Sequence, residues 1–153
     1  LPVCEALTRA SQAGVPIDLI VRGFCCLRPG VPGWTDNLRV RSIVGRFLEH
    51  GRVFHFANGA ENPLDGEFFI GSADWMDRNL SRRVEAVTPI RVRHLRERLW
   101  EDLTVQLEDR RNAWQMRPDG TYQRLEAAEG ASDVAREGTH ATHMKRTRAR
   151  LRR

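Results

Sequence analysis

The stretch IDLIVRGFCCLRPG, residues 17–30, starts with an apolar run that contains one Asp and continues with an Arg-Gly pair, two cysteines and a second Arg. The apolar run predicts a short buried strand, and the Pro-Gly pair at the far end predicts a loop. In a doubly wound sheet, ligands bind beyond the carboxyl ends of the strands. Arg22 stands at such an end and Arg28 follows in the loop, so both are candidates for contacting an anion.

Helical and extended patterns follow one another around this strand. Apolar residues three and four apart predict a helix after Pro2 that Gly14 and Pro16 end. Together the elements predict an α/β domain with a mixed sheet flanked by helices, plus a hairpin at Asp119-Gly120. The other expected elements are strands at 40–44, 53–57 and 67–72, a short helix at 74–80, a strand at 82–89 that Pro89 ends, and a helix over 90–107.

Charge is concentrated at the end of the chain. The formal net charge is +5, and residues 140–153 hold six Lys or Arg and no acidic residue. We expect one domain over residues 1–127, including the hairpin, and a basic, flexible tail over residues 128–153. A nucleic-acid or membrane-surface patch is the alternative interpretation of this tail. The chain starts with Leu rather than Met, from which we expect a piece of a longer protein.

Several functional classes lack their signature in this sequence. The nucleotide-binding loops G-x-x-x-x-G-K-[ST] and G-x-G-x-x-G, the zinc-protease pattern H-E-x-x-H and the hydrolase pattern G-x-S-x-G are all absent. The three cysteines do not have the spacing of a metal site. No stretch has the length and hydrophobicity of a transmembrane segment, and the N-terminus has no signal-peptide pattern. We therefore expect a cytoplasmic protein, with peripheral membrane association as the alternative.

Polar residues gather at three predicted strand ends or turns, and these are the candidate sites. Each candidate also has a structural interpretation. His50 could be an ordinary exposed histidine, Asp74 could cap the following helix, and Arg78 could belong to a solvated helix face. His55, inside VFHF, is expected to be structural. The three groups are Arg22 with Arg28; Glu49, His50 and Arg52 in LEHGR; and Ser72, Asp74, Arg78 and Asn79 in GSADWMDRN.

Longer motifs give these candidates a context. Residues 11–59, which include VRGFC and LEHGR, and residues 71–90, which start with GSADWMDRN, closely resemble the C-terminal catalytic part of bacterial polyphosphate kinases, a family that extends polyphosphate from ATP. RPDGTYQRL, residues 117–125, resembles the terminal hairpin of that family. The H-x-R at 50–52 and the G-S at 71–72 are also similar to the H-x-K and G-S patterns of phospholipase D-like phosphoryl-transfer domains. The resemblance implies a phospholipase D-like fold.

The resemblance also implies roles for single residues. Arg22 would contact the nucleotide or phosphate, and His50 would be one of two active-site histidines. The other histidine, which becomes phosphorylated, would lie in a second phospholipase D-like half that is absent from this chain. Arg28, Arg52 and Arg78 would line the anion path. Mg²⁺ would be bound through the phosphates and the absent part, with no metal ligand in this chain.

These implications define the expected function and its alternatives. The chain would be half of the active site of an ATP:polyphosphate phosphotransferase that acts through a phosphohistidine, and it would be inactive alone. Its partners would be ATP or ADP, polyphosphate, the upstream half of the same enzyme and a further copy in a homo-oligomer, with no specific nucleic acid. The alternatives are a phospholipase D-like phosphodiesterase or nuclease half-site and a non-enzymatic polyanion-binding remnant.

Overall fold

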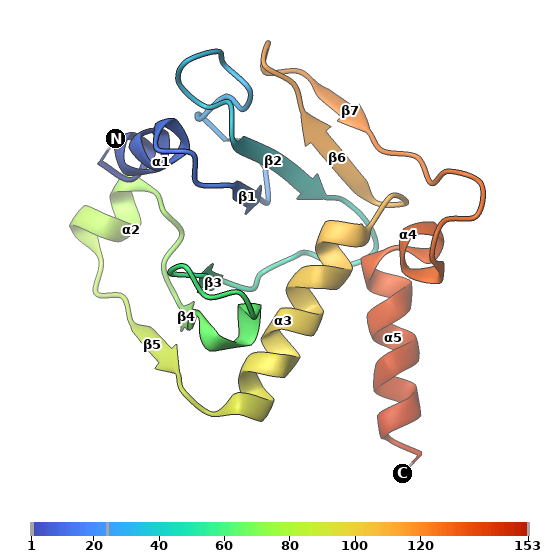
Figure 1. The fold of residues 1–153 in the computed structure, drawn as a ribbon. Helices are drawn as coiled ribbons and strands as arrows, with labels where there is room; N and C mark the ends of the chain where they lie inside the picture. Colours follow the sequence, from blue (N-terminus) through green and yellow to red (C-terminus); the bar gives the residue numbers. More distant parts are fainter. Residues whose placement is uncertain (1, 24, 153) are drawn as a thin grey trace. The chain divides into compact units, whose positions relative to one another are not determined.

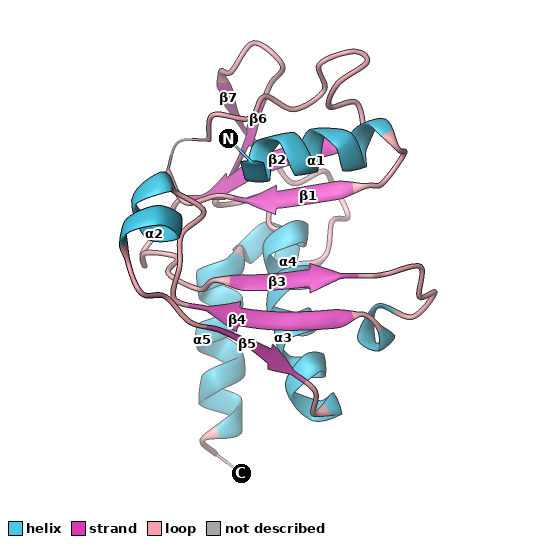
Figure 2. Cartoon of the chain, turned by 90° about the vertical axis from the view of Figure 1, so that its left-hand side faces the viewer, coloured by secondary structure: helices cyan, strands magenta, loops and turns pink. Residues whose placement is uncertain are grey.

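The computed structural model describes residues 2–23 and 25–152, which divide into two compact units. The first unit combines the chain up to Glu49 with the chain from Val105 onward, and the second comprises His50–Thr104. Helix α3 (Arg93–Glu108) runs from the second unit into the first. Figure 1 and Figure 2 show the elements of both units, and each unit is described by itself below.

A four-stranded mixed sheet forms the centre of the first unit. β1 and β2 are parallel, whereas β6 is antiparallel to both β2 and β7. A parallel pair needs a crossover connection, and residues 21–37 supply it here. The strand order is β1 (Ile17–Ile20), β2 (Leu38–Ile43), β6 (Ala113–Met116) and β7 (Tyr122–Arg124).

Helix α1 (Pro2–Gln12) lies along β1 in Figure 2 and helps to cover this sheet. Leu7 of the helix packs against a buried cluster of Leu38, Val40 and Met116. Burial of such side chains is the main favourable contribution to folding, so this cluster fixes β1 on the sheet. The backbone N–H of the residue after β1, Val21, still bonds to the Arg41 carbonyl at 2.8 Å. Residue 22 is therefore the first one beyond the sheet.

An antiparallel sheet of β3 (Val53–Phe56), β4 (Glu67–Gly71) and β5 (Val87–Ile90) organises the second unit. The 3-10 turn η1 (Pro63–Asp65) joins β3 to β4, and helix α2 (Asp77–Arg82) lies between β4 and β5. Phe68 is only 1% exposed, and its ring centroid lies 4.6 Å from that of His55. His55 also packs on Trp100 and contacts the Pro63 carbonyl through Nε2 at 2.9 Å. These contacts confirm the structural role expected for His55.

The structure corrects the expectation of a single mixed sheet. The strands form two sheets, of which only the first is mixed. The predicted hairpin, β6 and β7, is part of the first sheet rather than an addition to it, because β6 pairs with β2. Local periodicity can predict a strand but not its partner, and here the partners lie about seventy residues apart in the sequence.

The predicted boundaries of two elements in the second unit are wrong. Strand β5 begins at Val87 rather than at residue 82, and it continues through Pro89 instead of ending there. Among the described strands, β5 pairs with β4 alone and is an edge strand, where proline is tolerated. Helix α2 begins at Asp77 rather than at residue 74.

Two helices occupy the segment for which we expected a flexible tail. Ser132 caps α4 (Asp133–Glu137) by accepting the Ala135 N–H at 3.2 Å. Helix α5 (Thr139–Arg150) follows directly, and its first residue is fully buried. The Thr139 N–H donates to the Asp109 carboxylate at 2.7 Å, a contact that the local charge pattern does not indicate. The domain boundary at residue 127 stays a prediction.

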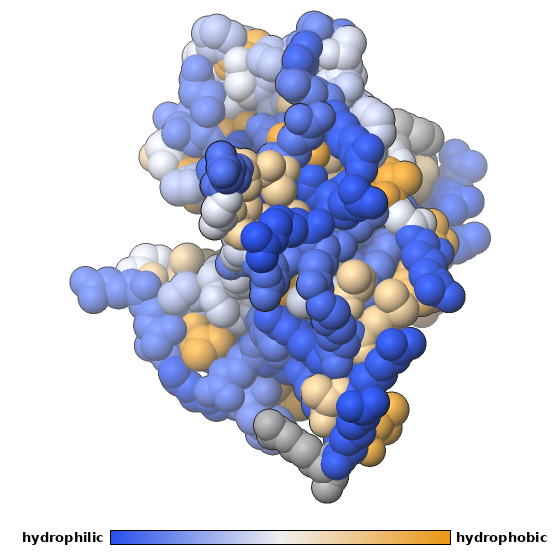
Figure 3. Space-filling view, turned by 90° about the vertical axis from the view of Figure 1, so that its right-hand side faces the viewer, coloured by the Kyte–Doolittle hydropathy of each residue, from blue (hydrophilic) through white to orange (hydrophobic). Residues whose placement is uncertain are grey.

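Figure 3 shows a face of the molecule on which hydrophilic side chains predominate and apolar side chains form small groups. Among the helices of the described residues, none is both long and apolar enough to cross a membrane. The apolar side chains on this face are ordinary for a folded chain, because much of any protein surface is apolar.

Candidate functional site

The five residues predicted to contact substrate are distributed over both units. Arg22 and Arg28 belong to the first unit, where both are exposed in the connection between β1 and β2. His50, Arg52 and Arg78 belong to the second unit. Within the second unit, the structure brings His50 and Arg52 into direct contact.

The pairing of β3 with β4 creates this local site. Val53 of β3 pairs with Ile70 of β4, and the Gly71 N–H donates to the Arg52 carbonyl at 3.0 Å. The start of β3 and the end of β4 therefore lie side by side. Arg52 precedes β3 and Asp74 follows β4, so the two side chains extend from adjoining strand ends.

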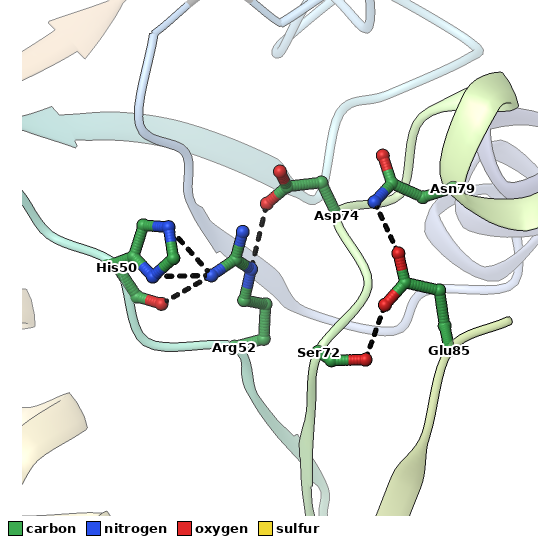
Figure 4. A network of polar contacts seen from close by, with 6 residues as sticks. All are labelled: His50, Arg52, Ser72, Asp74, Asn79 and Glu85. Atoms are coloured by element: carbon green, nitrogen blue, oxygen red, sulfur yellow. Dashed lines mark hydrogen bonds and ion pairs between the residues drawn. The ribbon is translucent and has the colours of Figure 1, made fainter. Parts of the chain in front are cut away.

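The Arg52 guanidinium joins Asp74 to His50 (Figure 4). Its Nε donates to Asp74 Oδ1 at 3.0 Å, and its Nη1 donates to the His50 carbonyl at 2.8 Å. The Arg52 side chain is 15% exposed and that of Asp74 is 29% exposed, so water screens this ion pair only in part. Because the guanidinium is planar, contacts through Nε and Nη1 fix its orientation.

Arg52 also contacts the imidazole of His50. Nη1 lies 2.8 Å from Nδ1 and 3.2 Å from Nε2 of the ring. Arginine can only donate hydrogen bonds, so the ring nitrogen that accepts from it carries no proton. Nδ1 is the nearer nitrogen, and a neutral ring that accepts there carries its proton on Nε2. His50 is exposed, so a ligand can reach it.

An aromatic stack supports the loop that carries Asp74. The rings of Phe54 and Trp75 are nearly parallel, at 4°, with centroids 5.0 Å apart. Phe54 belongs to β3 and Trp75 directly follows Asp74. Aromatic contacts of this kind add to the stability that burial alone provides. The stack therefore ties the residue after Asp74 to the strand that follows Arg52.

A second polar group stands beside the first one (Figure 4). The Glu85 carboxylate accepts hydrogen bonds from the Ser72 hydroxyl and from Asn79 Nδ2, the latter at 2.7 Å. These two bonds, that of Ser72 first, hold the pKa of Glu85 below its usual value of 4.5. The Ser72 hydroxyl also accepts the Ala86 N–H at 3.0 Å. These hydrogen bonds therefore connect the residue after β4 with the residues that precede β5.

The structure rules out the structural alternative for Asp74 and agrees with the one for Arg78. Asp74 does not cap α2, since the N-cap is Met76 and Asp74 pairs with Arg52. Arg78 lies on α2 and is exposed, and no described residue forms a hydrogen bond or ion pair with its guanidinium. Glu85 was not predicted, because it stood in a segment taken for a strand and no motif marked it. The phosphate-binding role of Arg78 stays a prediction.

Among the residues that the structure describes, the carboxylates of the candidate site are already engaged by other side chains. Within the described ranges, no three His, Cys, Asp or Glu side chains gather in a way that could bind one. Asp74 already pairs with Arg52, and Glu85 with Ser72 and Asn79. The expectation that Mg²⁺ is bound through phosphates and other parts of an enzyme stays a prediction.

Comparison with known proteins gives a consistent result. The family described as "Polyphosphate kinase C-terminal domain 2" matches residues 2–136. The polyphosphate kinase of Thermosynechococcus vestitus is 55% identical over 145 residues, 95% of this chain, and that of Neisseria meningitidis serogroup B is 56% identical over 133 residues, 86% of this chain. The crystal structure of polyphosphate kinase from Porphyromonas gingivalis matches 95% of this chain with a TM-score of 0.82 and 36% identity.

The chain corresponds to a small part of each of these proteins. It spans 19% of the Thermosynechococcus and Neisseria proteins and 22% of the Porphyromonas chain. Similarity at this level shows the fold and the family of the matched segment. The activity of a whole enzyme depends on residues outside it as well.

The lowered pKa of Glu85 gives a test by pH. A carboxylate with a depressed pKa in the folded state stabilises the protein above its unfolded pKa, and this contribution is lost as the pH falls through the folded value. Between about pH 6 and about pH 3, the thermal midpoint of Glu85→Gln should therefore fall less than that of the wild type. Thermal unfolding followed by circular dichroism measures this difference.

Glu61→Gln is the matched control, because Glu61 is exposed. Its midpoint should follow the wild type over the same pH range. If Glu85→Gln and Glu61→Gln behave alike, the hydrogen bonds of Glu85 do not favour its ionised form.

Proposed function

The chain belongs to the polyphosphate kinase family, whose C-terminal domain 2 it contains, and we propose that it supplies part of the site that transfers the terminal phosphate of ATP reversibly to polyphosphate. The main support is the exposed imidazole of His50. Arg52 contacts this ring and forms an ion pair with Asp74. The remainder of the site would come from segments outside this chain. The isolated chain would then be inactive.

The proposed reaction has two steps. A histidine outside this chain attacks the γ-phosphorus of ATP, the bond from that phosphorus to the bridging oxygen breaks, and ADP leaves with the electron pair. A terminal oxygen of polyphosphate then attacks the phosphohistidine, and the histidine nitrogen leaves. Such transfers depend mainly on positioning and on compensation of charge.

His50 would act on the phosphate oxygens. With Nδ1 accepting from Arg52, the Nε2–H of the neutral ring is available to donate to an oxygen of the transferring group. That bond would strengthen as charge develops on the oxygen in the transition state. Asp74 would keep Arg52, and through it the ring, in one orientation.

Arginines would supply most of the charge compensation. Arg22, Arg28 and Arg78 are exposed, and a guanidinium can bind two phosphate oxygens at once. Arg52 was predicted to contact phosphate, but its described contacts are with His50 and Asp74. We therefore propose that Arg52 orients His50 and that any phosphate contact it makes is additional.

The proposal extends to finer points of architecture and assembly. The H-x-R at 50–52 precedes β3 and the G-S at 71–72 ends β4, which supports a phospholipase D-like arrangement. ATP, ADP and polyphosphate would be the substrates, with Mg²⁺ bound through their phosphates. The partners would be the other segments of the same enzyme and a second copy in a homo-oligomer.

The central test replaces His50 in a complete polyphosphate kinase that carries this chain as its C-terminal part. His50→Gln should lower the rate of polyphosphate synthesis by about a hundred- to thousandfold, the usual cost of losing a donor that stabilises charge in the transition state. Its free energy of unfolding should change by less than about 0.5 kcal/mol, because the residue is exposed. Initial rates and denaturant unfolding measure the two effects.

His55→Gln is the matched control. His55 packs on Phe68 and Trp100, so its loss should cost about 1–3 kcal/mol of stability with little change in turnover per folded molecule. An active His50→Gln enzyme that is merely less stable would contradict the catalytic assignment.

A second test concerns Arg22. Arg22→Ala should weaken nucleotide or phosphate binding by roughly ten- to hundredfold, the equivalent of a lost charge-assisted hydrogen bond. Arg22→Lys should lose less, because it keeps the charge but not the two-pronged contact. Equilibrium binding of ATP and short polyphosphate measures both variants. Equal, near-native binding by both would show that Arg22 is structural.

A further inference from the structure

The segment immediately before His50 has little structure of its own. Residues 44–49 form neither helix nor strand, and Phe47 and Leu48 are 50% and 70% exposed. Apolar burial therefore does little to fix this segment. Its course has to be set by polar contacts, and in the first unit two of these come from His140 near the start of α5.

His140 contacts this segment through both ring nitrogens. Nε2 lies 2.7 Å from a carboxylate oxygen of Glu49, and Nδ1 accepts the Phe47 N–H at 3.4 Å. The two contacts agree on one neutral tautomer, with the proton on Nε2. The Phe47 ring meets the imidazole edge to face at 5.5 Å. The side chains of His140 and Glu49 are 7% and 26% exposed, so water screens this pair only in part.

The backbone of the segment is shaped to this histidine. A Cβ added at Gly45 would lie 2.6 Å from Nδ1 of His140, which is closer than real contacts allow. Only glycine therefore lets the segment pass so close to the ring. The neighbouring residue Val44 is also held, because its N–H donates to the Asn112 carbonyl at 2.9 Å.

The start of α5 is itself fixed. Oδ2 of the buried Asp109 accepts the Thr139 N–H, and Oδ1 accepts the backbone N–H groups of Arg111 and Asn112, all at 2.7 Å. A buried carboxylate that receives three N–H groups is a strong anchor. Asp109 directly follows α3, so α5 is tied to the end of that helix.

These contacts form a chain from Asp109 through Thr139 and His140 to Glu49, whose next residue is His50. We propose that His140 is a positioning residue for the transfer reaction, because it holds the segment from which His50 extends. This inference rests on the proposed function of His50. It gives helix α5, which carries His140, a role in positioning His50. This helix lies beyond residue 136, where the family match ends, and its charge pattern suggested only a basic tail.

Kinetics of a complete polyphosphate kinase that carries this chain test the proposal. His140→Ala and Glu49→Ala should each lower kcat by roughly ten- to hundredfold, since a displaced reacting group costs about that much. The KM for ATP should change little. The double variant should be no slower than His140→Ala alone, because that variant already removes the contact with Glu49. Glu49→Gln keeps an acceptor for Nε2–H and should retain more activity than Glu49→Ala.

The matched control is His94→Ala. His94 lies exposed on α3, and no described residue forms a hydrogen bond or ion pair with its ring. Its replacement should leave kcat unchanged. Independent, additive losses for His140→Ala and Glu49→Ala would overturn the proposal, as would a folded His140→Ala enzyme with native kcat.

Amide hydrogen exchange in the isolated chain gives a readout that does not depend on activity. His140→Ala should speed exchange across residues 44–50, where the Phe47 N–H loses its acceptor, while β2 stays protected. Unchanged exchange in this segment would overturn the proposal. If the unmodified enzyme makes no polyphosphate but exchange responds as expected, the proposed function fails and the anchoring by His140 stands.

Discussion

The ion pair between Arg52 and Asp74 is the contact on which the candidate site depends. It connects the residue before β3 with the loop after β4, at the ends of two antiparallel strands that the core around Phe68 holds together. Asp74 accepts from the Nε of Arg52, and the Nη1 of the same guanidinium contacts the ring and the carbonyl of His50. A free arginine at this position could bind phosphate but would leave the histidine unsupported.

The residues on either side of His50 in the sequence, Glu49 and Arg52, each have a partner in their own unit. In the second unit, Arg52 is held by Asp74. In the first unit, Glu49 is held by His140. His50 itself is exposed, so its ring can meet a ligand, and Arg52 contacts that ring within the second unit. Such preorganisation is what phosphoryl transfer requires of a protein, since the bond changes themselves occur within the phosphates.

Local sequence patterns predicted the elements but not their long-range partners. The apolar spacing after Pro2, the aromatic strand around His55 and the Asp119-Gly120 turn are short-range signals, and the structure confirms each of them. The pairing of β2 with β6 and the anchoring of α5 by Asp109 involve residues far apart in sequence, which periodicity cannot connect. For the same reason, the basic residues of α5 suggested a flexible tail and did not indicate that the first turn of this helix is buried.

The candidate site shows the same division. His50 and Arg52 stood out only through the LEHGR motif and its family resemblance, because an exposed histidine has no periodic signal. Asp74 was recognised as polar, but its partner followed only from the register of β3 and β4. Glu85 was missed altogether, since its hydrogen bonds to Ser72 and Asn79 depend on how the chain returns after α2.

The most direct test exchanges this chain for the matching segment of the Thermosynechococcus relative and measures ATP-dependent polyphosphate synthesis by the hybrid, with and without Asp74→Asn. The account predicts that the hybrid synthesises polyphosphate and that Asp74→Asn lowers its kcat by roughly tenfold or more, with the KM for ATP little changed. A folded hybrid without synthesis would contradict the assignment of this chain to the transfer site. An Asp74→Asn hybrid with native kcat would contradict the role of the Arg52–Asp74 pair.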